Sequence, residues 1–146
     1  TALESEIDGV TINSKIKANN PKKIYIMLGT NSVGYSDGNY LANCMGELVQ
    51  QISQITKAKV YVLSIPPITY YAEADYDNAL TTSAINEYNT ALESVIKGTK
   101  AKFLDFHSVL TAPDGYYYEE YHEMDGIHFM GKTYEVMLSY LQKHSS

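Results

Sequence analysis

The stretch KIYIML at Lys23–Leu28, followed at once by Gly29-Thr30-Asn31, decides the fold of this chain. It is short, almost wholly apolar, and rich in β-branched and aromatic side chains, which favours a strand over a helix. A strand that is apolar on both faces is typical of a parallel sheet covered on both sides. The segments Lys59–Ile65 and Ala101–Phe106 are similar in length and composition. The sequence therefore predicts three short, buried, parallel strands.

Helical patterns separate the three strands. Apolar residues recur every three or four positions from Asn39 to Thr56 and from Thr81 to Lys97, and a last helix is expected from Lys132 to Lys143. Strands that alternate with helices predict a doubly wound α/β sheet. In such folds the active site lies at the carboxyl ends of the strands. The N-terminal stretch Ala2–Lys17 is ambiguous and could hold a helix interrupted near Gly9.

Composition and charge narrow the function. The chain has 146 residues, enough for one domain, and a net charge of -6. Basic residues form no cluster beyond pairs such as Lys22–Lys23, so a nucleic-acid partner is not expected. The longest apolar run is far short of the roughly 20 residues that cross a bilayer, so no membrane span is expected. Cys44 is the only cysteine and is expected to be a buried, unreactive thiol on the apolar face of its helix.

The first motif with chemical potential is Gly29-Thr30-Asn31, directly after the first strand. Gly29 allows a sharp turn, and Asn31 would then stand at the carboxyl edge of the sheet. Its side-chain amide could donate a hydrogen bond to a developing oxyanion. Taken alone, the three residues are equally typical of an ordinary turn.

The second motif is Asp125-Gly126-Ile127-His128, just before the last helix. The spacing allows the carboxylate of Asp125 to reach the imidazole of His128. Such a carboxylate holds one ring nitrogen protonated and leaves the other free to act as a general base. An Asp-Gly turn followed by a surface histidine would have the same sequence.

Together, in this order and within an α/β pattern, the two motifs resemble those of the SGNH/GDSL-type hydrolases, a family of esterases and lipases. The likeness runs from about Lys22 to Lys143 and implies a flavodoxin-like three-layer α/β/α sandwich. It also implies that His128 is the general base and Asp125 its orienting partner. Asn31, with Gly29 of the same motif, would bind the oxyanion and substrate. Smaller features that agree with the resemblance lie at Ser64–Pro67, Asn86–Asn89 and Asp105.

The family's Gly-Asp-Ser block, which carries the nucleophilic serine after the first strand, has no counterpart here. Ser5 and Ser14 follow no strand, and Ser64 precedes an Ile-Pro-Pro segment instead of opening a helix. Gly9 is the nearest candidate for the glycine of the second block. We therefore expect a single domain over residues 1–146 that lacks its N-terminal strand or strands. Because a bare strand edge invites association, the expected partner is a complementary N-terminal segment or second chain.

The resemblance implies a serine ester hydrolase whose Ser-His-Asp triad takes its serine from outside this chain. The expected substrate is a small ester, and no cofactor or metal is required. The tyrosine-rich stretch Tyr116–Tyr118, shortly before Asp125, favours an O-acetylated carbohydrate over a long acyl chain. Rim packing is the plainer interpretation of these tyrosines. The resemblance also suggests an extracytoplasmic bacterial protein.

Two other interpretations stay open at this point. A non-catalytic ligand- or carbohydrate-binding module on the same scaffold would also lack a nucleophile, because fold does not fix function. A metal site is the weaker alternative, since its candidate ligands match no strong spacing signature. Those ligands would be His107, His122, Asp125 and His128.

Overall fold

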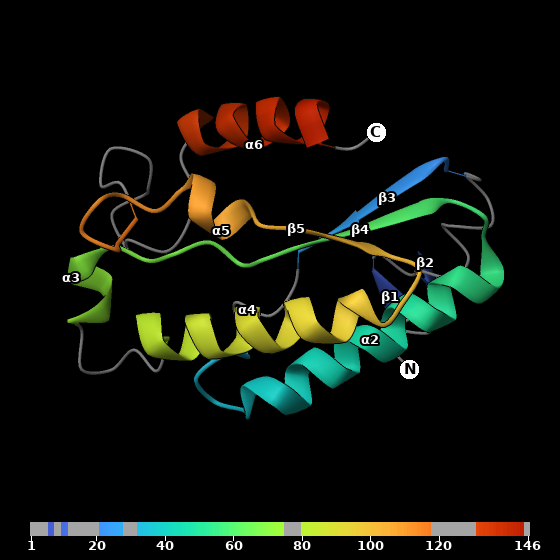
Figure 1. The fold of residues 1–146 in the computed structure, drawn as a ribbon, viewed down its shortest axis with the longest axis horizontal. Helices are drawn as coiled ribbons and strands as arrows, with labels where there is room; N and C mark the ends of the chain where they lie inside the picture. Colours follow the sequence, from blue (N-terminus) through green and yellow to red (C-terminus); the bar gives the residue numbers. More distant parts are fainter. Residues whose placement is uncertain are drawn as a thin grey trace.

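The computed structural model of the chain describes residues 6–7, 10–11, 21–27, 32–74, 80–117 and 131–144. Within them, a parallel sheet has the strand order β3-β4-β5, and helices lie on both of its faces (Figure 1). The strands are β3 (Lys23–Ile26), β4 (Lys59–Leu63) and β5 (Lys102–Leu104). This is the doubly wound α/β fold that the sequence predicts.

The central strand β4 is the most deeply buried, and Val62 within it has no exposed surface. The parallel register pairs Tyr25 of β3 with Tyr61, and Tyr61 with Lys102 of β5. The rings of Tyr25 and Tyr61 stack with their centroids 5.1 Å apart. The three strands therefore begin together at one edge of the sheet and end together at the other.

All three strands end two residues earlier than the sequence predicts, and β3 is only partly buried, with Tyr25 40% exposed. At β5 the cause is Asp105, whose carboxylate accepts hydrogen bonds from the backbone N–H of Ser108 at 3.2 Å and from its hydroxyl at 2.6 Å. A side chain that accepts in this way caps a helix. It begins the short helix α5 (Phe106–Val109), so Phe106 becomes helical instead of ending the strand.

The long helices match their predicted positions to within one residue at each end. α2 (Gly38–Ile55) and α4 (Thr82–Lys97) cover one face of the sheet, while α5 and α6 (Gly131–His144) lie on the other (Figure 1). A further short helix, α3 (Tyr70–Glu73), follows β4 and was not predicted.

Apolar side chains pack on both sides of the sheet. The cluster between the sheet and α2 and α4 includes Ile26, Val49, Ile52, Val60, Val62, Ile85, Leu92 and Ile96. The cluster on the α6 side consists of Tyr61, Leu63, Leu104, Phe106, Leu110 and Tyr117.

The N-terminal stretch contains short strands, whereas the sequence allowed a helix there. Its described residues form two short strands, β1 (Glu6–Ile7) and β2 (Val10–Thr11), which pair antiparallel. In this pairing Ile7 lies opposite Val10 and Glu6 opposite Thr11.

The expectation that Cys44 is buried is wrong, because its side chain is exposed. The buried stripe of α2 centres on Met45 and Val49. Cys44 precedes Met45 by one residue, and one residue turns a helix by about 100°. The thiol therefore lies at the margin of the apolar stripe.

α2 and α4 approach closely at Gly46. A Cβ atom built on Gly46 would lie 2.6 Å from Cγ1 of Val95. Val95 is β-branched, and a β-branched side chain in a helix has little freedom to turn away. The lack of a side chain at position 46 therefore sets the spacing of the two helices.

We predict that Gly46→Ala lowers the free energy of unfolding by about 1–3 kcal/mol, the usual cost of overpacking. In a Val95→Ala background the same change should cost far less, because alanine leaves room and favours the helix. Urea denaturation of the four proteins of this cycle measures both values. An equal cost in the two backgrounds would contradict the contact.

Candidate active site

The four site residues predicted from the sequence, Gly29, Asn31, Asp125 and His128, lie outside the described residues. Their roles stay predictions. The described neighbours of the first motif are Met27 and Ser32, and α6 begins three residues after His128. Both motifs therefore adjoin elements of the sheet or the helix layer that the structure describes.

The chain that leaves β4 is held by one side chain. Asn89 of α4 accepts a hydrogen bond from the backbone N–H of Ile65 and donates one to its carbonyl, each 2.9 Å long. One residue earlier, the backbone N–H of Ser64 donates to the carbonyl of Leu104 at 3.1 Å. Residues 64–69 are buried as a result, although they form no regular structure.

His107 of α5 reinforces the same point. Its Nδ1 lies 3.0 Å from the carbonyl oxygen of Ile65. Because a carbonyl only accepts, the hydrogen belongs on Nδ1 and the neutral ring keeps Nε2 as its acceptor. Asn89 Nδ2 is also 3.4 Å from this nitrogen, but two donors do not bond to each other. Ile65 is thus held by two elements at once.

Ser64, Asp105 and His107 have the residue types of a serine triad but not its geometry. The hydroxyl of Ser64 accepts from the backbone N–H of His107 at 2.7 Å and lies 3.5 Å from Asp105. A triad needs the imidazole itself against the hydroxyl. Here the imidazole faces a carbonyl, and Ser64 has no exposed surface.

We call this set of four residues, Ser64, Asn89, Asp105 and His107, the carboxyl-edge brace. The position of Ser64 before an Ile-Pro-Pro segment argues against its being the nucleophile, and the contacts of the brace agree. The brace itself could not be predicted from the sequence, because its members lie up to 43 residues apart. The available signal was a set of polar residues at Ser64, Asn89 and Asp105 that match the family pattern.

A tyrosine pair flanks the brace. The rings of Tyr70 and Tyr116 meet edge to face, 5.5 Å apart, and Tyr70 is 57% exposed. The backbone N–H of Tyr117 donates to the carbonyl of Ile68 at 2.8 Å, which joins this segment to the chain after β4. The first part of the tyrosine-rich stretch therefore lies on the carboxyl side of the sheet.

Glu73 ties the pair to α4. Burial raises the pKa of its carboxyl group, but hydrogen bonds from Tyr116 and Thr82 outweigh this and bring the pKa below its ordinary value. The bond from the backbone N–H of Thr82 is 2.7 Å long. The carboxylate is thus the form that the fold favours.

The described ranges contain neither a cluster of metal ligands nor a helix that could span a membrane. No group of three or more His, Cys, Asp or Glu side chains there could hold a metal ion. No helix in that part of the chain is both long and apolar enough to cross a bilayer.

The sheet and the brace define a doubly wound α/β protein whose chemistry is expected at the carboxyl edge. The chain belongs to the GDSL-like Lipase/Acylhydrolase family, whose model matches residues 6–136. This confirms the SGNH/GDSL-type family that the two motifs indicate. No curated protein is significantly similar to the chain in sequence.

Solved structures share the fold. A Streptococcus pneumonia protein named for platelet activating factor has a TM-score of 0.76 at 21% identity, over 92% of this chain and 68% of its own. A GDSL-like lipase from Bacteroides thetaiotaomicron has a TM-score of 0.67 and 21% sequence identity. The match covers 84% of this chain and 61% of that one. An acetylxylan esterase from Geobacillus stearothermophilus has a TM-score of 0.66 and 14% sequence identity. The match covers 88% of this chain and 61% of that one. The chain thus spans 61–68% of their lengths.

We predict that Ser64→Ala lowers stability by about 1–3 kcal/mol, because the buried N–H of His107 loses its acceptor. If the intact protein hydrolyses esters, this variant should keep kcat within a few-fold of wild type. Urea denaturation and p-nitrophenyl acetate turnover measure the two effects. A folded Ser64→Ala protein without turnover would show that the hydroxyl reacts.

We also predict that Tyr116→Phe destabilises the fold at pH 7 and not in acid. A carboxyl group whose pKa is lower in the folded state adds stability above its unfolded pKa, and this stability is lost as the pH falls through the folded pKa. The lost hydrogen bond raises the pKa of Glu73 and narrows that difference. Thermal melting of the wild type and of Tyr116→Phe, from pH 7 down into acid, shows whether the difference in Tm shrinks as the pH falls. An unchanged gap in Tm at every pH would contradict it.

Proposed function

We propose that this chain is the larger part of a serine ester hydrolase that cleaves acyl esters at the carboxyl edge of its sheet. Its family membership supports the reaction class. The observation that carries the proposal is the order of two motifs, Gly29-Thr30-Asn31 after β3 and Asp125-Gly126-Ile127-His128 before α6, on the fold of that family.

The proposed reaction has two steps. A serine from outside this chain attacks the ester carbonyl, and His128 takes its proton while Asp125 orients and stabilises the ring. The acyl–serine bond forms, the bond to the alcohol breaks, and the alcohol leaves with the proton from His128. Water then releases the acid by the same steps. In both steps the side-chain amide of Asn31 donates a hydrogen bond to the oxyanion.

The described residues support a rigid frame for this chemistry. The brace fixes Ile65 through three contacts of 2.9–3.0 Å. Between β3 and α2, Val33, two residues after Asn31, is 1% exposed and anchors the chain that enters α2. A site built on such supports needs little reorganisation during the reaction.

We propose an O-acetylated carbohydrate as the substrate. Tyr70 exposes an aromatic ring on the carboxyl side, and its partner Tyr116 holds the edge of that ring. Amphipathic rings of this kind suit sugar faces, which are apolar with polar rims. The acetylxylan esterase among the structural neighbours acts on such an ester, on the same fold.

We predict that His128→Ala in the intact protein nearly abolishes turnover of p-nitrophenyl acetate and acetylated xylan oligosaccharides, and that Asp125→Asn reduces it severely. Loss of a triad member costs orders of magnitude in serine enzymes. Asn31→Ala should cost on the order of 10²–10³-fold in kcat if its amide binds the oxyanion.

The matched control is His144→Ala, which removes an exposed histidine at the end of α6. Its kcat should stay near that of the wild type. Turnover by His128→Ala at the wild-type rate would refute the assigned roles. A wild-type protein that binds acetylated oligosaccharide but cleaves no ester would be a binding module instead.

A further inference from the structure

A hollow of about 470 Å³ opens at the amino ends of β4 and β5, the edge opposite the brace. The end of α2, the loops before both strands and the first residues of the strands form its walls. The polar side chains that line it are Ser53, Thr56, Lys57, Lys59, Lys100 and Lys102. We call it the lysine hollow.

The strand register brings these lysines together. Lys59 is the register partner of Lys23 in β3. On its other side, Lys102 begins β5 opposite Tyr61, and Lys100 lies in the loop two residues before that strand. The four lysines of the hollow are exposed, so their charges face the solvent and repel one another only weakly when no ligand is bound. An anion that binds among them would be attracted by all four.

The segments that line the hollow carry no acidic residue. Residues 53–62 and 97–103 contain no Asp or Glu, although the chain carries 17 of them and a net charge of -6. The nearest described ion pair, Lys97 with Glu93 at 3.3 Å, lies on the surface of α4 and uses no lysine of the hollow. Lys102 donates to the carbonyl of His144 at 3.4 Å, at the end of α6.

The carboxyl terminus of α2 explains only part of this charge. A helix end attracts one or two cations within its last turn, yet the last turn of α2 has none. Lys57 follows the C-cap Thr56, whereas Lys59 begins β4 and Lys100 lies in the loop before β5. The hollow therefore contains more positive charge than the dipole of α2 accounts for.

We propose that the lysine hollow binds a phosphate-bearing anion. Phosphate offers up to two negative charges and several acceptor oxygens, which ammonium groups from different elements can share. A volume of about 470 Å³ lies in the usual range of ligand sites and exceeds what a bare phosphate fills. The phosphate belongs to a soluble phosphorylated compound or to a lipid headgroup.

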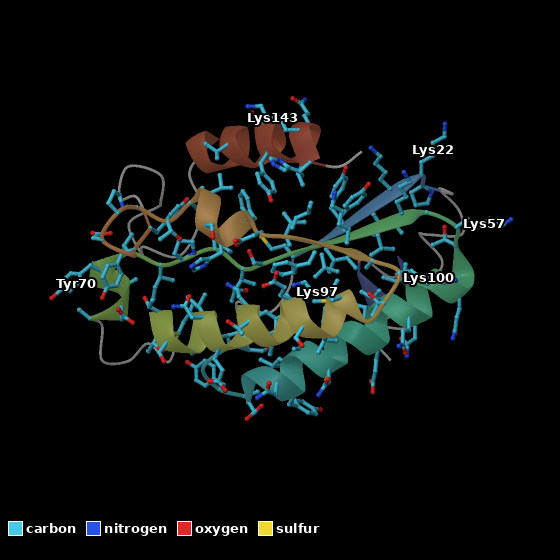
Figure 2. The ribbon with its side chains drawn as sticks, viewed as in Figure 1. Lys22, Lys57, Tyr70, Lys97, Lys100 and Lys143 are labelled. Carbon is cyan, nitrogen blue, oxygen red and sulfur yellow. The ribbon has the colours of Figure 1, made fainter. Side chains whose placement is uncertain are left out.

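The position of the hollow separates this anion from the acyl chemistry. Figure 2 shows Lys57 and Lys100 at one end of the molecule and Tyr70, on the carboxyl side, at the other. A bound anion would leave the proposed site open. The hollow is therefore a second site and not part of the ester site.

The test is titration of the intact protein with pyrophosphate at low salt, with calorimetry to measure the affinity. The variant Lys57→Gln/Lys100→Gln removes two charges from the hollow. Its control, Lys57→Arg/Lys100→Arg, keeps both positive charges at the same two positions. We expect the hollow variant to bind about tenfold or more weakly and the control within about twofold, because a guanidinium also donates hydrogen bonds to phosphate oxygens.

Sedimentation with vesicles separates the two sources. Retention by phosphatidylglycerol vesicles, absent with phosphatidylcholine and lost in the hollow variant, assigns the anion to a lipid headgroup. Pyrophosphate binding without such retention assigns it to a soluble compound. Failure of the wild-type protein to bind either probe, or an equal loss in both variants, overturns the proposal.

Discussion

The two hydrogen bonds between the Asn89 side chain and the backbone of Ile65 fix where the chain goes after the central strand. β4 has a neighbour on each side and helices on both faces, so its exit sets the shape of the whole carboxyl edge. His107 adds a third contact from α5. A buried, irregular segment needs such partners, because its polar backbone groups lose water. The brace supplies them, and the proposed chemistry depends on the frame that results.

The same parallel sheet gives its two edges different properties. Each of the three strands begins with a lysine, namely Lys23, Lys59 and Lys102, so the amino edge of the sheet is cationic. Strands that end together bring together the brace and the tyrosine pair Tyr70–Tyr116. One topology thus separates a cationic edge from an edge that suits neutral acyl and sugar groups. A single net charge of -6 conceals this division.

Local periodicity predicted the strands, the long helices and the fold, because each element is apolar on the face that it buries. It failed where one side chain decides the outcome. Asp105 caps α5 and shortens β5, and a turn of one residue around α2 leaves Cys44 exposed. The brace and the lysine hollow were missed for a different reason. Both bring together residues that are far apart in the sequence, such as Ser64 with His107 and Lys59 with Lys102, and these meet only in the folded protein. Asn31 and His128 were predicted as site residues from the resemblance to the family and not from local periodicity.

The central claim is that Ser64 supports the carboxyl edge while another serine performs the chemistry. The most direct measurement is labelling of the intact protein with a fluorophosphonate, followed by mass spectrometry of its peptides. The account predicts one labelled serine outside Thr1–Ser146, with labelling lost in His128→Ala. A label on Ser64 would contradict it, since the brace would then be the reactive group.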